Sequence, residues 1–292
     1  MKTVYLNKFM SSVVTELEMN GQYGTAHVCG SVLRSVMAFG GEGLPVSGIT
    51  PLWLKAYEGY LLHKGGKGLA WNTVSTYMRM LQAVYNRAVA RKLAAFIPHQ
   101  FRDVFTGRKA DHRRVLERDD MQKLLVEREP DITSPGMAWA RACLELMFRF
   151  HGMPFVDLAH LRKSDLKDGY LTLRRRKTGM PLSARVDGRA MQLLERYRNR
   201  DDTSPYLLCF LDGNLEGMAA YRDYQRILRL LNSRLRALAL WKKVQGKVTS
   251  YSARHTWGYG GQVLPHSHRG HFRRAGTRFR NHHRRVYERV RK

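Results

Sequence analysis

The spacing of apolar residues predicts helices through the first hundred positions. In Ala26–Phe39 the apolar residues Val28, Val32 and Val36 recur at four-residue steps and so share one helical face. A later segment repeats at three- and four-residue steps, through Val74, Tyr77, Leu81, Val84 and Ala88. Residues 1–105 are therefore predicted to form a compact helical domain.

Two helix starts in this region can be predicted from their residue types. Thr50 is followed by Pro51, and a proline early in a helix removes an N–H group that would have no partner there. Asn72 precedes the second periodic segment and is predicted to be its N-cap, because an Asn side chain can accept a backbone N–H of the first turn.

The second half of the chain combines helices with a short region of alternating polarity. Ala138–Phe150 is a strongly apolar helix, and Gln225–Trp241 places Leu228, Leu231, Leu235 and Leu238 on one stripe. An acidic start at residues 117–120 suits the positive end of a helix dipole. Between these helices, GYLTLRRRKTGMPLSARV alternates apolar and polar residues around Gly179, which predicts an antiparallel sheet of two or three strands. The fold class is thus mainly α with a small antiparallel β-sheet.

Two weakly periodic segments mark the limits of these regions. The basic segment Phe101–Val115 indicates an interdomain linker, which we place at residues 106–116. A second domain then spans 117–257. Residues 258–292 form a tail with nine Arg, one Lys, five His and a single acidic residue, Glu288, and no helical or strand period runs through it.

Composition indicates a globular intracellular chain. A hydrophobic content of 43% is enough for packed cores, and no apolar run reaches the length of about 18 residues that a membrane helix needs. The N-terminus has no sustained apolar stretch of the secretory kind. Cys29, Cys143 and Cys209 are widely spaced among apolar neighbours, which favours buried free thiols in a reducing cytoplasm over disulfides or metal ligands.

The charge narrows the choice of partner. A net charge of +27 and a pI near 10.5 make the surface attractive to polyanions, and nucleic acid is the first candidate. An anionic membrane is the rival, but no basic amphipathic helix with an aromatic face stands out.

Three motifs in order resemble the tyrosine recombinase (phage integrase) family, in the branch carried by bacterial mobile elements. They are FHGMPFVDLAHLRKSDL (150–166), RRRKTGMPL (174–182) and TSYSARHTW (249–257). The resemblance covers nearly the whole chain, since residues 1–105 are similar to the family's SAM-like core-binding domain and 117–257 to its α+β catalytic domain. It implies a protein that binds double-stranded DNA, acts as a tetramer on DNA, and uses no metal, cofactor or small-molecule substrate.

The resemblance also implies a reaction and the groups that it needs. A tyrosine attacks a DNA phosphodiester and forms a phosphotyrosyl link, which the partner strand's hydroxyl later resolves. The pentavalent phosphorane gathers negative charge and requires guanidinium donors. The leaving sugar hydroxyl requires a proton from a general acid.

Four residues of these motifs stand at the family's catalytic positions: two match the family and two depart from it. Arg254 matches the arginine of the His-x-x-Arg motif, while Tyr251 replaces its histidine and His255 follows, serving packing or chemistry. Lys177 matches the hairpin lysine, the usual general acid. His151 stands where the family has its first active-site arginine; imidazole is mostly neutral at pH 7 and cannot form a bidentate fork.

The neighbours of these residues are assigned supporting roles. Arg174, Arg175 and Arg176, beside Lys177, are candidate phosphate contacts, with a solvated basic strand as the alternative, and Lys163 is a further candidate DNA contact. Arg149 lies two residues from His151, on another helical face, and is a poor substitute for the missing arginine. Asp157 and Asp165 fit capping and charge pairing better than catalysis.

The tail departs from the family, which has an apolar helix, a Leu-Gly-His turn and the nucleophilic tyrosine after the position of Trp257. Two explanations remain open: a basic DNA-binding arm, or a shift of reading frame just after Trp257, because the alternative frame permits an apolar segment followed by Leu-Gly-His. Tyr287, 33 residues after Arg254, is either the nucleophile or an accidental tyrosine. The histidines of the tail lack cysteine or acidic partners and form a weak metal site.

Two functions follow from these observations. The first is a site-specific DNA recombinase or integrase whose activity is reduced by His151 and the altered tail. The alternative is a DNA-binding remnant of an integrase that no longer cuts DNA.

Overall fold

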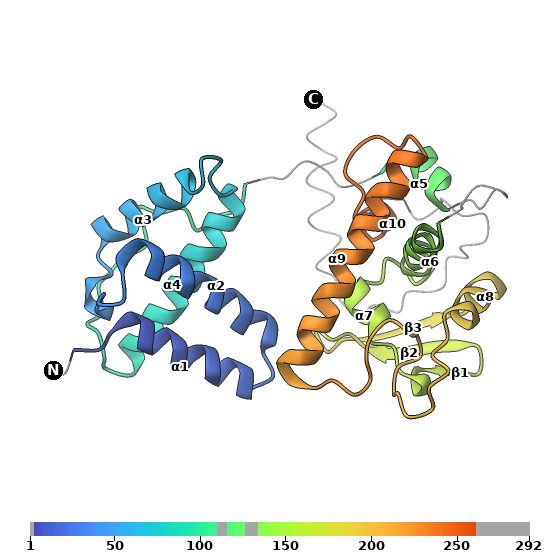
Figure 1. Cartoon of the computed structure of the whole chain (residues 1–292), viewed down its shortest axis with the longest axis horizontal. Helices are drawn as coiled ribbons and strands as arrows, with labels where there is room; N and C mark the ends of the chain where they lie inside the picture. The colour runs from blue at the N-terminus through green and yellow to red at the C-terminus, as the bar shows by residue number, and fades with distance from the viewer. Residues whose placement is uncertain (1–2, 110–115, 126–133, 261–292) are drawn as a thin grey trace. The chain divides into compact units, whose positions relative to one another are not determined.

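The computed structural model describes residues 3–109, 116–125 and 134–260 (Figure 1). The chain divides into two compact units. Unit 1 comprises Met1–His112 with Glu216–Tyr221, and unit 2 comprises Arg113–Leu215 with Arg222–Lys292. The tail predicted over 258–292 lies outside the described residues from position 261 onward, and so does Tyr287.

Unit 1 is a bundle of α-helices around one apolar core. Its elements are α1 (Leu6–Met19), α2 (Tyr23–Gly40), the 3-10 turn η1 (Val46–Gly48), α3 (Pro51–His63) and α4 (Trp71–Ala90). Most of the predicted periodic residues are buried, namely Val32, Val36, Val74, Leu81, Val84 and Ala88, while Val28 and Tyr77 are partly buried and pack against the same core. Phe101 and Val104 belong to the same core, so the chain is still packed on the bundle after α4 ends.

One predicted helix start in unit 1 is confirmed and the other is wrong. Thr50 is the N-cap of α3, its hydroxyl accepts the Trp53 N–H at 3.1 Å, and Pro51 occupies the first helical position. The N-cap of α4 is Ala70, without a side-chain hydrogen bond, and Asn72 lies inside the helix. The amide of Asn72 binds the backbone of Lys109 instead, a contact 37 residues away that local residue types could not predict.

Unit 2 contains helices and one three-stranded antiparallel sheet, as predicted. The helices are α5 (Arg118–Leu125), α6 (Pro135–Arg149), α7 (Phe155–Ala159), α8 (Gly188–Arg196), α9 (Gly217–Trp241) and α10 (Ser252–Gly260), with the 3-10 turn η2 (Lys163–Asp165). The first residues of α9, up to Tyr221, belong to unit 1. The sheet has the order β1-β2-β3, from β1 (Leu166–Lys167), β2 (Tyr170–Arg174) and β3 (Pro181–Arg185). Leu173 pairs with Leu182 and Arg174 with Pro181, so residues 175–180 form the hairpin tip.

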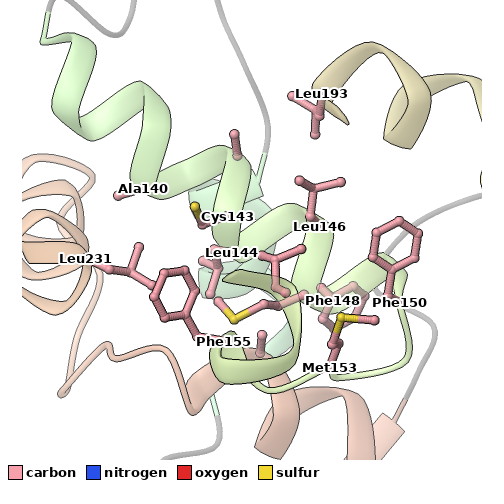
Figure 2. Packing of buried hydrophobic residues seen from close by; sticks show 14 of the residues in the cluster. Ala140, Cys143, Leu144, Leu146, Phe148, Phe150, Met153, Phe155, Leu193 and Leu231 are labelled. Atoms are coloured by element: carbon pink, nitrogen blue, oxygen red, sulfur yellow. The ribbon is translucent and has the colours of Figure 1, made fainter. Parts of the chain in front are cut away.

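The core of unit 2 is built around α6. From Ala140 to Phe148 every residue of this helix is buried, and Figure 2 shows side chains from α6, the following turn, α8 and α9 gathered around it. Burying one helix on all sides fixes its C-terminal end, and with it the turn that carries His151.

The three cysteines are free, but only two are buried. Cys29 and Cys143 lie in the two cores, whereas Cys209 is exposed, so the prediction that it is buried is wrong. Its apolar neighbours Leu207 and Leu208 are buried. The three residues lie outside regular helices and strands, so the burial of two does not predict the burial of the third.

Candidate active site

Arg254 lies on α10 and is held against the turn that follows α6. Its Nη1 donates to the carbonyl oxygen of Gly152 at 3.1 Å. The side chain is partly buried, and burial first and then the positive charge of Arg175 lower the pKa of Arg254. A guanidinium with fewer water contacts interacts more strongly with an anion that enters beside it.

The turn after α6 has an unusual backbone. His151 has φ 58° and Gly152 has φ 68°, two successive residues in the left-handed region. A Cβ on Gly152 would lie 3.0 Å from the Cα of Arg254 and 3.4 Å from the Cβ of Trp257. Glycine therefore allows α10 to approach the turn, and the close approach sets the position of Arg254.

Replacing Gly152 with alanine is expected to destabilise unit 2 and displace Arg254. The left-handed backbone costs an L-residue about 1–2 kcal/mol, and the contact with α10 adds to this. Gly169→Ala is the matched control, because Gly169 has φ 74° and nothing within 4 Å of a Cβ. Chemical denaturation of both variants tests the prediction. An equal loss of stability in the two would show that the approach to α10 does not matter.

His151 does not stand on the helix itself, as its predicted place at the end of α6 implied. The helix ends at Arg149, Phe150 is the C-cap, and His151 begins the left-handed turn. Its ring lies 5.4 Å from the ring of Trp257 on α10. Burial lowers the pKa of His151, so the imidazole is neutral at pH 7 and supplies no fixed positive charge.

The β2–β3 hairpin is attached to α7 through Asp157. The buried Asp157 accepts the Arg176 N–H at Oδ1 (3.0 Å), and its Oδ2 lies 3.5 Å from Nε of Arg175. Arg175 is partly buried, whereas Arg174, Arg176 and Lys177 are exposed. Asp157 thus orients the first residues of the hairpin tip, the role in charge pairing expected from the sequence.

Two of the other predicted site residues have different surroundings. Tyr251 is half exposed, and its ring lies 5.8 Å from the His255 ring. Lys163 donates to the carbonyl oxygen of Asp201 at 2.7 Å and lies 3.8 Å from the Asp202 carboxylate. Arg254 and Arg175 thus lie within electrostatic range of each other, whereas Lys163 is engaged in a separate loop contact.

Arg149 is already held by two carboxylates. It donates to Glu145 Oε1 at 2.9 Å and to Asp187 Oδ2 at 2.6 Å. Glu145 is buried and also contacts Arg141 (3.3 Å) and Arg189 (3.3 Å). This ion group was missed from the sequence, although Arg141, Glu145 and Arg149 recur every four residues on an otherwise apolar helix.

Among the described residues, no group of three or more His, Cys, Asp or Glu side chains is placed to hold a metal ion. No helix in the same part of the chain is long and apolar enough to cross a bilayer.

One family model matches the N-terminal part of the chain. Residues 5–102 match the family described as the phage integrase SAM-like domain. No curated protein matches the chain by sequence. The matched residues cover the helices of unit 1.

Solved integrase structures share the fold of nearly the whole chain. A lambda integrase dimer bound to a COC′ core site has a TM-score of 0.60 at 15% identity, covering 87% of this chain and 89% of its own. A lambda integrase tetramer bound to a Holliday junction gives 0.59 at 15% identity, with 96% and 77% covered. The Tn1549 transposon integrase in complex with transposon right end DNA gives 0.57 at 15% identity, with 99% and 100% covered.

The SAM-like domain match and the shared fold agree with the resemblance to the tyrosine recombinase (phage integrase) family that the motifs indicated. The predicted fold class, mainly α with a small antiparallel sheet, is confirmed.

Proposed function

We propose that this chain is a site-specific DNA recombinase that binds duplex DNA through both units and holds a scissile phosphate against Arg254. The observation that carries the proposal is the placement of Arg254, fixed by the Gly152 carbonyl and lying within electrostatic range of Arg175. Two guanidinium groups that repel each other in the free protein gain stability together when a phosphate lies between them.

In the proposed reaction a tyrosine hydroxyl gives its proton to solvent, and its oxygen forms a bond to phosphorus as the bond to the sugar oxygen breaks. Arg254 and Arg175 donate to the non-bridging oxygens, whose negative charge increases in the phosphorane. Lys177, exposed at the hairpin tip, gives a proton to the leaving sugar oxygen, which an arginine could not do. Tyr287 is the candidate nucleophile. The step is reversed when a second strand's hydroxyl attacks the phosphotyrosyl link.

DNA and copies of the same chain are the proposed partners. The related structures were solved with DNA, two of them as a dimer and a tetramer of lambda integrase. The net charge of +27 supports binding to a polyanion, and assembly on DNA would offset the repulsion between such charged copies.

DNA binding is tested by titrating a fluorescent duplex at several salt concentrations. If two units neutralise about six to ten phosphates, the logarithm of the binding constant should fall against the logarithm of salt with a slope of about −5 to −9. A slope near zero would contradict binding through the phosphate backbone.

A DNA-binding protein without cleavage activity is the second candidate. One observation favours it. His151 is neutral, and Arg149 is held by Glu145 and Asp187, so neither replaces the positive charge of the arginine that the family has at this position.

Replacing His151 with arginine is therefore expected to accelerate DNA cleavage by about 100-fold, the usual effect of one charged donor to a developing oxyanion. Single-turnover cleavage of a nicked duplex measures the rate. Gln245→Arg adds the same charge at an exposed position and should leave the rate unchanged. Equal rates in the wild type and His151→Arg would mean that this position does not face the phosphate.

A further inference from the structure

The loop that follows α4 carries three consecutive apolar residues in contact with water. Phe96 is 72% exposed, Ile97 is 37% exposed, and Pro98 is exposed beside them. We call residues 96–98 the apolar tip. Large apolar side chains are usually buried, so a run of them on the surface of a packed domain indicates a place where a partner binds.

The apolar tip is held on both sides by the core of unit 1. Before it, the hydroxyl of the buried Tyr85 donates to the Ala95 carbonyl at 2.8 Å. After it, the buried Gln100 donates through Nε2 to the Ile49 carbonyl. The chain is therefore fixed at both ends of the tip while Phe96 stays in water. A side chain presented in this way loses little conformational freedom when a partner binds.

The apolar tip borders a groove of about 440 Å³ that is rich in side-chain amides. Gln82 and Asn86 line it from α4, and Gln100 lines it from the loop after the tip. His99 and Arg102 are also part of its wall. Among the described residues that line the groove, none carries a carboxylate. Amides and a guanidinium are hydrogen-bonding groups suited to base edges and phosphates.

The sequence around the groove is basic over a long stretch. Residues 59–102 contain seven Lys or Arg and no Asp or Glu. The Arg91 guanidinium is paired with Glu16 of α1 at 2.7 Å, but Arg102 is exposed at the groove. A second copy of this chain, with its net charge of +27, would be repelled here, whereas duplex DNA would be attracted.

We propose that the apolar tip is a wedge that enters the minor groove of duplex DNA and separates two stacked base pairs. Phe96 is the inserted side chain, and the amides of the groove contact the neighbouring base edges. Proteins that kink DNA from the minor groove combine an apolar wedge of Phe, Ile or Pro with Arg, Asn and Gln in the same way. The inference rests on the proposed function, because unit 1 must bind duplex DNA, and it adds which surface deforms that DNA.

A wedge should prefer DNA in which the base stack is already interrupted. In an intact duplex the two base pairs must be unstacked before the ring can enter, and this costs free energy. The probes are a duplex of about 30 bp with a central TA step, which is an easily unstacked sequence, and the same duplex with two mismatches at that step. The wild type should bind the mismatched duplex about tenfold more tightly than the intact one.

Three variants of the full-length chain separate the wedge from other causes. Phe96→Ala should bind the two duplexes equally, and Phe96→Leu should keep most of the preference, because leucine also serves as a wedge. Leu52→Ala is the matched control, since Leu52 is an apolar side chain on α3 that is 82% exposed. It should keep the full preference. Both side chains lie largely in water, so thermal unfolding should show that all three variants fold like the wild type.

A second readout is the shape of the bound DNA. Energy transfer between dyes at the two ends of the intact duplex reports bending at saturating protein. A wedge kinks DNA by about 20–90°, so the wild type, Phe96→Leu and Leu52→Ala should bring the ends closer together. Phe96→Ala should leave the duplex straighter.

The same preference for mismatched DNA in the wild type and Phe96→Ala would overturn the proposal and leave the apolar tip to a protein partner. A duplex that stays straight in the wild-type complex would overturn it too. So would an equal loss in Leu52→Ala and Phe96→Ala, because any exposed apolar side chain would then have the same effect. A wild type that binds neither duplex would instead overturn the proposed function.

Discussion

Replacing Arg254 with alanine is expected to slow DNA strand cleavage by about 100- to 1000-fold. The guanidinium is partly buried and fixed by the Gly152 carbonyl, so it is already oriented when a phosphate arrives. Its contribution should increase as charge develops on the phosphorane, which is why the cleavage rate should change more than affinity. The affinity for duplex DNA should fall by no more than about tenfold, the effect of one lost charge-assisted contact. Single-turnover cleavage and equilibrium binding measure the two quantities.

Arg200→Ala is the control for the loss of one positive charge. The Arg200 side chain is 76% exposed and lies 4.0 Å from Glu195. This variant should cleave at the wild-type rate. If Arg254→Ala and Arg200→Ala slowed cleavage equally, the slower rate would reflect only the loss of net positive charge. The site assigned to Arg254 would then be wrong.

Replacing Glu145 with glutamine is expected to destabilise unit 2 by about 3–5 kcal/mol, the usual cost of breaking a buried ion pair from one side. Glu145 contacts Arg141, Arg149 and Arg189, and the Arg141 side chain is completely buried. Without the carboxylate, Arg141 would keep a buried charge beside two other guanidinium groups. Hydrogen exchange resolved by peptide measures the loss, with the amides of unit 1 as an internal reference.

Glu195→Gln is the matched control on the surface. Its carboxylate pairs with Arg198 at 43% side-chain exposure, where ion pairs contribute about 0–1 kcal/mol. A similar small effect for Glu145→Gln would show that the buried group is not held mainly by charge. Loss of protection in unit 1 as well would contradict independent folding of the two units.

The helices and the hairpin could be predicted because their signals are local. Val74, Leu81 and Val84 follow the helical period and are buried, and Thr50 caps α3 with its hydroxyl just before a proline at the first helical position. The turn at Gly179, with φ 66°, separates two strands whose residues alternate as expected. In each case the residues that decide the structure lie within one or two turns of each other.

The site itself was only partly predictable, since its geometry depends on distant contacts. The approach of Gly152 to Arg254 joins positions about a hundred residues apart, and a left-handed His151 cannot be read from the residue type. Asn72 is a residue type common at N-caps, yet its side chain hydrogen-bonds to the backbone of Lys109. The motif order predicted which residues form the site, and the packing of α10 on the turn after α6 sets the position of Arg254.

Covalent capture tests the central claim most directly. A nicked duplex with the candidate site is incubated with wild type, Tyr287→Phe and Tyr251→Phe, then denatured and examined for a protein–DNA adduct. The account predicts an adduct in the wild type that is lost in Tyr287→Phe and retained in Tyr251→Phe. A wild type that binds the duplex and gives no adduct, but gives one when the alternative reading frame after Trp257 is restored, would contradict strand cleavage and establish a DNA-binding remnant.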